Sequence, residues 1–280
     1  MKIPYLKHVR LKKLDIVIFG IIICVGLFVA YTFFRKSTYL VATVKIGSES
    51  VLWWDKGSTN AWFHQYFREG NKELDGFGGV VAEVLHVRSY DTTPNQKAVY
   101  ATVRLKVVFN RASDQYTFRG KPVLIGSTLR LHLDRLLAEG LVTAIEGVEN
   151  HSTVKKIIVE AKLVENNAVY LGTEGVNIYR AAVLNIGDEI KDSQNNTVIT
   201  IINKHVEDAE TVVPTATGLL LKQRHPIKKD VYYTLEVNAQ QIGDRYYVFD
   251  DVPLLVGEML PLNTETAFLT PVVTSIRVDD

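Results

Sequence analysis

The pattern of apolar and polar positions divides the chain into a short N-terminal apolar run and a long remainder with strand periodicity. No charged residue occurs between Ile16 and Phe34, a stretch of 19 residues. At a helical rise of about 1.5 Å per residue, such a stretch covers roughly the hydrocarbon core of a bilayer. We expect a transmembrane helix over residues 14–34, because backbone amides in lipid must pair within the segment.

Basic residues flank this apolar run unequally. Five lysines and arginines precede it, whereas only Arg35 and Lys36 follow it immediately. This asymmetry predicts a single-pass protein of the cell membrane, with a cytoplasmic tail over residues 1–13 and an extracytoplasmic remainder. A cleaved signal peptide and a lipidated Cys24 are the alternatives. However, no Ala-x-Ala site follows the run, and the residues before Cys24 are not small.

The remainder of the chain reads as mainly β. Short β-branched segments bounded by Gly, Pro, Asn and Asp are typical of strands and hairpins. The clearest ones cover residues 38–47, 80–87, 98–109 and 231–240. Helical spacing is limited to residues 61–69, after a capping Asn60, and to residues 179–184. The expected fold is therefore a β ectodomain with few and short helices.

An internal repeat is present in this β region. Fourteen residues from Phe118 onward align without a gap with those from Phe249 onward, at an offset of 131. The identities include Phe118 and Phe249, Pro122 and Pro253, and Gly126 and Gly257. Proline should open a strand or lie at a sheet edge, and glycine permits a bulge or a tight bend. We predict two tandem related modules, residues 38–150 and 151–280, each a curled sheet or partly open barrel with one short helix. Convergence of two hairpins is the alternative.

The junction between the basic tail and the apolar run, Arg10-Leu-Lys-Lys-Leu14-Asp15, resembles the start of the domain-of-unknown-function 4330 family. In that family a short basic stretch and an Asp precede the apolar helix, and a Gly-Asp step follows the first strands, as Gly187-Asp188 does here. The resemblance implies a single-span bacterial membrane protein with a small β ectodomain. This chain departs from the family by carrying two modules, and the resemblance implies no activity.

Composition excludes several classes of function. The net charge of +1 provides no basic surface for nucleic acid. Cys24 is the only cysteine, so the predicted ectodomain has no disulfide and no thiolate, which favours a bacterial envelope. The seven histidines form no His-x-x-x-His or His-x-His pair, and neither a phosphate loop nor a nucleophile elbow occurs. We therefore predict no catalytic residue, no metal ligand and no cofactor, and we interpret Asp250-Asp251 as part of a solvated turn.

An aromatic cluster is the most distinctive local feature. Its candidate surface residues are Trp53, Trp54, Trp62, Phe63, Tyr66 and Phe67, with Phe77 close behind. Such rings pack into a core, contact a partner, rest on the outer leaflet of a membrane or stack on sugars. Because adjacent residues in a strand point to opposite faces, Trp53 and Trp54 cannot both be buried by one core.

A second candidate surface is the segment 207–230, which contains Leu219, Leu220 and Leu221. It is a long connection with an apolar run, or an extra strand pair within its own module. We expect a non-enzymatic, membrane-anchored envelope scaffold or adaptor that engages a protein partner or forms a homo-oligomer. The alternative is a lipid- or glycan-binding ectodomain of an envelope transport system. An enzyme ranks third.

Overall fold

The computed structural model describes residues 18, 20–27, 38–47, 58–148, 152–165 and 175–278, and all structural statements concern these residues. The prediction of a mainly β chain is confirmed, with 61% strand, few helices and a nearly closed, barrel-like sheet. Residues 18 and 20–27 are helical. No helix among the described residues is long and apolar enough to cross a membrane, and most of the predicted span at 14–34 lies outside them.

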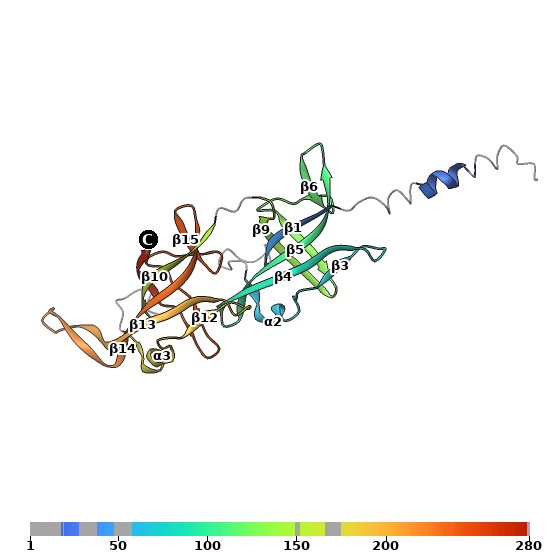
Figure 1. Ribbon diagram of the computed structural model, residues 1–280. Coiled ribbons are helices and arrows are strands. Elements are labelled where there is room, and N and C mark those ends of the chain that lie inside the picture. The colour runs from blue at the N-terminus through green and yellow to red at the C-terminus, as the bar shows by residue number, and fades with distance from the viewer. Residues whose placement is uncertain are drawn as a thin grey trace, which may run out of the picture. The chain divides into compact units, whose positions relative to one another are not determined.

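The chain forms two compact units, residues 1–38 and 39–280, and the larger unit holds two large sheets (Figure 1). The first sheet has the strand order β3-β4-β5-β1-β9-β8, with β2, β6 and β7 attached at the side. Its elements are β1 (Thr38–Ile46), β2 (Thr59–Asn60), α2 (Ala61–His64), β3 (Lys72–Leu74), β4 (Val80–Thr93), β5 (Gln96–Asn110), β6 (Gln115–Phe118), β7 (Lys121–Pro122), β8 (Thr128–Leu133) and β9 (Leu136–Ile145).

The second sheet has the order β12-β13-β14-β10-β19, and a separate pair, β17-β18, lies outside it. The elements of this half are β10 (Thr153–Leu163), β11 (Val176–Asn177), α3 (Ile178–Val183), β12 (Glu189–Lys191), β13 (Thr197–Pro214), β14 (Leu220–Ile242), β15 (Arg245–Val248), β16 (Val252–Pro253), β17 (Leu262–Asn263), β18 (Phe268–Leu269) and β19 (Val272–Val278).

The two sheets repeat the same topology. The first five strands of the first sheet's order, β3-β4-β5-β1-β9, correspond to the whole order β12-β13-β14-β10-β19, and β2 pairs with β5 as β11 pairs with β14. Pro122 pairs with Thr117 and Pro253 pairs with Tyr247 at matching edges. The amides of Gly126 and Gly257, both at positive φ, donate to Val142 and Val273 over 2.8 Å. Each glycine thus makes the tight bend that precedes the closing strands.

The offset between equivalent residues changes only in turns and loops. It is 117 from β1 to β4 (Val44 to Ala161), 132 in β5 (Val103 to Leu235), 130 in β6 (Gln115 to Arg245) and 131 after the next turn (Val142 to Val273). Phe118 and Phe249 are therefore not equivalent. Phe118 pairs with Lys121 at the end of β6, whereas Phe249 lies in the turn with φ 54°.

One turn has the same hydrogen-bond geometry in both halves of the chain. Asp75 in the β3–β4 turn accepts hydrogen bonds at Oδ1 from the amides of residues 77 and 79, at 3.0 and 2.7 Å. Asp192 in the β12–β13 turn accepts the same two bonds from residues 194 and 196, at 2.8 and 2.9 Å. The Asp side chain fixes each turn because it satisfies amides that the strand ladder leaves unpaired.

The strand β5 joins the two hydrophobic cores. Its residues 98–101 are all buried, although a half-exposed strand should alternate. Val99 and Ala101 belong to the core of the first sheet, whereas Ala98 and Tyr100 belong to the core of the second, together with Tyr90 of β4. Each face of this strand end is thus covered by a different core, and the two halves pack as one body.

One sequence prediction of local structure is wrong, and another is confirmed in one of its two alternatives. The helix expected over 61–69 ends at His64, because the amide of Arg68 turns to donate to Asn71 Oδ1 at 2.7 Å and Phe67 enters the core. For the segment 207–230, the prediction of an extra strand pair within its own module is confirmed. The segment continues β13 and β14 as a hairpin arm.

Candidate functional site

The hairpin arm, defined as residues 206–229, is the most prominent part of the second sheet. Its strands stay paired from Val206 opposite Val231 to Pro214 opposite Leu220, with an irregularity after Asp208. The turn is closed by the amide of Thr215, which donates to the carbonyl of Leu219 at 2.7 Å. The arm extends beyond the remaining strands of its sheet (Figure 1).

Apolar side chains cover the end of this arm, which we call the arm tip. They are Val212, Val213, Leu219, Leu220 and Leu221, with exposed fractions of 57%, 40%, 65%, 70% and 47%. Neighbouring residues in these strands point to opposite faces, and both faces of the tip are open because only two strands are present. An exposed apolar group of this size is typical of an interaction surface.

Ion pairs join the two strands of the arm between its base and its tip. Glu210 bridges Lys222, and Asp208 bridges Lys229 across the two strands. The Lys229 ammonium lowers the pKa of Asp208, first through the hydrogen bond and then through its charge. Opposite charges across a two-stranded ribbon support its register, so the arm presents its tip in a defined conformation.

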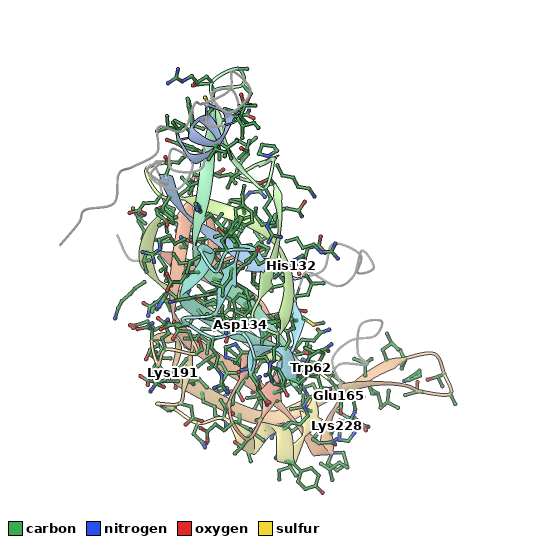
Figure 2. All side chains as sticks on the ribbon, turned by 90° about the vertical axis from the view of Figure 1, so that its right-hand side faces the viewer. Trp62, His132, Asp134, Glu165, Lys191 and Lys228 are labelled. Carbon is green, nitrogen blue, oxygen red and sulfur yellow. The ribbon has the colours of Figure 1, made fainter. Side chains whose placement is uncertain are left out.

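The predicted aromatic cluster is divided between core and surface. Phe67 is 1% exposed and its ring stacks on Phe63 at 6.1 Å, and Phe63 packs against the core of the first sheet. Trp62 and Tyr66 remain 59% and 63% exposed. Trp62 belongs to α2 and lies at the surface (Figure 2). Trp53 and Trp54 lie outside the described residues.

The two predicted surfaces are separate. The arm tip lies well apart from α2 in both views of the molecule (Figures 1 and 2). The structure therefore does not combine the leucines and the aromatic residues into one site.

Two neighbouring cavities share Ser58 and Gln96 in their linings. The smaller, about 290 Å³, is lined by Trp62, Phe63 and Leu137 among others. The larger, about 420 Å³, lies between the halves and is lined by Lys45, Gln96, Ala98, Val252 and Phe268 among others. Its volume falls in the range of small-molecule sites, about 300–1,000 Å³.

A polar junction accompanies the shared core. Arg88 of β4 bridges Asp250 at 2.7 Å, and Lys45 of β1 bridges Asp251. Burial raises the pKa of Asp250 despite the opposing effect of the Arg88 guanidinium. Burial also raises the pKa of Tyr90, and the nearby Asp250 carboxylate adds to the rise.

The interpretation of Asp250-Asp251 as a solvated turn is therefore wrong for Asp250, because this turn packs against the other half of the molecule. No sequence motif marks the contact, since its members lie 162 residues apart.

Among the described residues, no three His, Cys, Asp or Glu side chains gather closely enough to hold a metal ion. Comparison of the chain with protein-family models, with curated proteins and with solved structures finds no match. Its function must therefore be inferred from its own residues.

Proposed function

We propose that this chain is a non-enzymatic scaffold or adaptor of a bacterial cell envelope. In this proposal the apolar run at 14–34 is a single membrane span, the two tandem β modules lie outside the membrane, and the arm binds a protein partner. The uncharged run of 19 residues and the larger number of Lys and Arg residues before it than directly after it support the single-span topology. The exposed apolar tip of the arm is the observation that carries the partner contact.

The internal repeat strengthens this assignment. The corresponding β4–β5 hairpin of the first sheet ends in a short turn between Thr93 and Gln96. The offset between equivalent residues grows from 117 to 132 across the arm, so the second half has gained 15 residues there. The fold of the module does not require these residues, because the first module is complete without them. An extension that adds exposed leucines to a complete fold is best explained by a contact outside the chain.

The test is purification after mild detergent extraction, with and without chemical cross-linking. The variant Leu219→Ser/Leu220→Ser/Leu221→Ser should lose the associated partner or oligomer that the wild type retains. The control Ile186→Ser/Ile242→Ser changes side chains that are 61% and 47% exposed elsewhere on the same half, and it should retain the complex. An isolated wild-type monomer under all extraction conditions would refute the scaffold.

The larger cavity favours a second candidate, a ligand-binding ectodomain. Apolar Val252, Met259 and Phe268 line it together with threonines and the Lys45–Asp251 pair, a lining suited to an amphipathic lipid or a glycan. Native mass spectrometry of the purified chain decides between the two. A bound small molecule that is lost in Ala98→Trp would support a carrier, whereas a protein complex that depends on the arm tip supports the scaffold.

A further inference from the structure

One end of the first sheet, here called the entry end, collects the turns near the start of β1. β5 lies next to β1, and Arg104 of β5 sits over the ring of Tyr39 at 5.6 Å from its centroid. The end of β5 continues into β6 through the loop 111–114, and β4 opens from the turn 75–79 after β3. Figure 1 shows the β3–β4 and β5–β6 connections at the end of the sheet where β1 begins.

Large apolar side chains are exposed at the entry end. They are Tyr39 (51%), Leu74 (53%), Phe77 (89%), Val108 (55%), Phe109 (43%) and Tyr116 (38%). Phe77 stands at the top of the rigid turn that Asp75 closes with two hydrogen bonds. The apolar surface is therefore displayed on strands and a fixed turn rather than on a loose loop.

The second module provides an internal control for these positions. The equivalents of Tyr39, Leu74 and Phe77, at the offset of 117, are Lys156, Lys191 and Gln194. The equivalents of Val108 and Phe109, at the offset of 132, are Gln240 and Gln241. Five of the six apolar side chains are thus polar in the second copy, while Tyr116 has Tyr246 as its counterpart.

Because the second module folds with polar residues at these sites, the fold does not require them to be apolar. An apolar environment outside the protein explains the difference, since exposed aromatic and aliphatic groups otherwise face water. Lys106 and Arg111 lie in the same strand end and the following loop. Aromatic rings combined with Lys and Arg are typical of surfaces that meet lipid headgroups.

In the sequence, only a short segment joins the proposed membrane span to the start of β1. The apolar run ends at Phe34 and β1 begins at Thr38, so three residues lie between them and four Cα-to-Cα steps join them. At most about 3.5 Å per residue, this connection reaches only about 14 Å. The start of β1 is therefore held close to the bilayer surface, whatever conformation the connection takes.

We propose that the entry end of the first sheet rests on the outer surface of the bilayer, with the Phe77 turn inserted among the lipid headgroups. This inference rests on the proposed single-span anchor. It adds that the ectodomain is seated on the membrane in a fixed orientation instead of turning freely on its tether. The fixed seat defines the direction in which the arm meets its partner.

The test uses the full chain in liposomes that contain anionic lipid. In a Cys24→Ser background, Phe77→Cys carries a nitrobenzoxadiazole probe, and lipids with a doxyl group serve as quenchers. We expect the probe to emit at shorter wavelength than in water and to lose emission in doxyl-containing vesicles. The control Asp244→Cys, at the matching β14–β15 hairpin tip, should emit as in water and keep its emission.

A second measurement avoids the loss of the phenyl ring. With the probe at Val108→Cys, the variant Phe77→Gln installs the residue of the second module and should reduce quenching by lipid. Water-like emission at both positions in membrane-integrated protein would overturn the inference. Blue-shifted emission without quenching by lipid would also overturn it, because a protein would then cover the surface. Extraction of the chain by alkaline carbonate is a separate result that refutes the anchor itself.

Discussion

The contact of Tyr90 with the second core predicts that one ring couples the two halves in unfolding. Tyr90 belongs to β4 of the first sheet, yet it is only 6% exposed and packs in the core of the second. Its ring lies 5.4 Å from Phe249 and 6.2 Å from Tyr100. The substitution Tyr90→Ala removes this contact without changing a residue of the second half.

The expected magnitude follows from the burial of the ring. Truncation of a buried aromatic residue to Ala costs about 3–5 kcal/mol, and this figure already contains the aromatic pair contacts of about 0.5–1.5 kcal/mol. The hydroxyl approaches the polar junction, so part of the site can rehydrate after truncation. We therefore expect a loss near the lower limit, about 3 kcal/mol in the free energy of unfolding.

The assay compares two optical signals during urea denaturation of the purified chain. All three tryptophans lie between residues 53 and 62, so tryptophan fluorescence reports the first half of the chain. Far-ultraviolet circular dichroism reports both sheets. The two transitions should coincide in the wild type and separate in Tyr90→Ala, because coincident transitions indicate one cooperative unit.

Two controls make the result specific. Tyr90→Phe keeps the ring and should keep the transitions coincident. Glu207→Ala changes the equivalent strand position of the second half, where the side chain is 53% exposed, and should shift stability by less than about 0.5 kcal/mol. If Tyr90→Ala leaves both transitions unchanged, the shared core does not couple the halves and the reasoning fails.

Three further predictions concern single sites. Burial raises the folded-state pKa of Asp250 above its ordinary value of 3.8, so the stabilising contribution of this carboxyl is full below that value and declines as pH rises through the folded-state pKa. Relative to wild type, Asp250→Asn should therefore gain stability as pH rises above 3.8, and a difference that is constant with pH would contradict this. Gly140→Ala would place a Cβ 2.7 Å from a side-chain methyl of β1 and should lower stability by about 1–3 kcal/mol, whereas Gly76→Ala, with open space around it, should not. Glu73 is 1% exposed and bridges Arg119, so Glu73→Gln should cost about 1–3 kcal/mol by thermal unfolding, and an unchanged midpoint would argue against the buried ion pair.

The sequence pattern was sufficient to predict the β character of the chain and several of the positions that recur in its two halves. Alternation predicted the strands, and the prolines and glycines marked positions that recur in both sheets. The offset falls from 132 to 130 in the β14–β15 turn, where the second half lacks two residues, and rises to 131 in the β15–β16 turn, where it has one residue more. The Phe118–Phe249 match arose because an alignment without gaps applies the offset of 131 to β6 as well, where the offset between structurally equivalent residues is 130.

The features that sequence reasoning missed depend on contacts between distant segments. Residues 98–101 of β5 read as an ordinary strand, and nothing local indicates that two different cores bury its two faces. The register of the arm could not be predicted, because charged residues interrupt its alternation and cross-strand pairs such as Glu210 with Lys222 depend on how the two strands align. Asp250 looked solvated because its partner Arg88 is distant in sequence.

The comparison of equivalent positions also limits what can dock on the arm. In the first half, Arg88 and Tyr90 form the junction with the following module. Their equivalents in the second half are His205 and Glu207, which are 67% and 53% exposed. A buried ring has thus been replaced by a solvated acid at the arm base. The internal junction is therefore not repeated there, and a partner of different shape is expected to contact the apolar tip rather than the base.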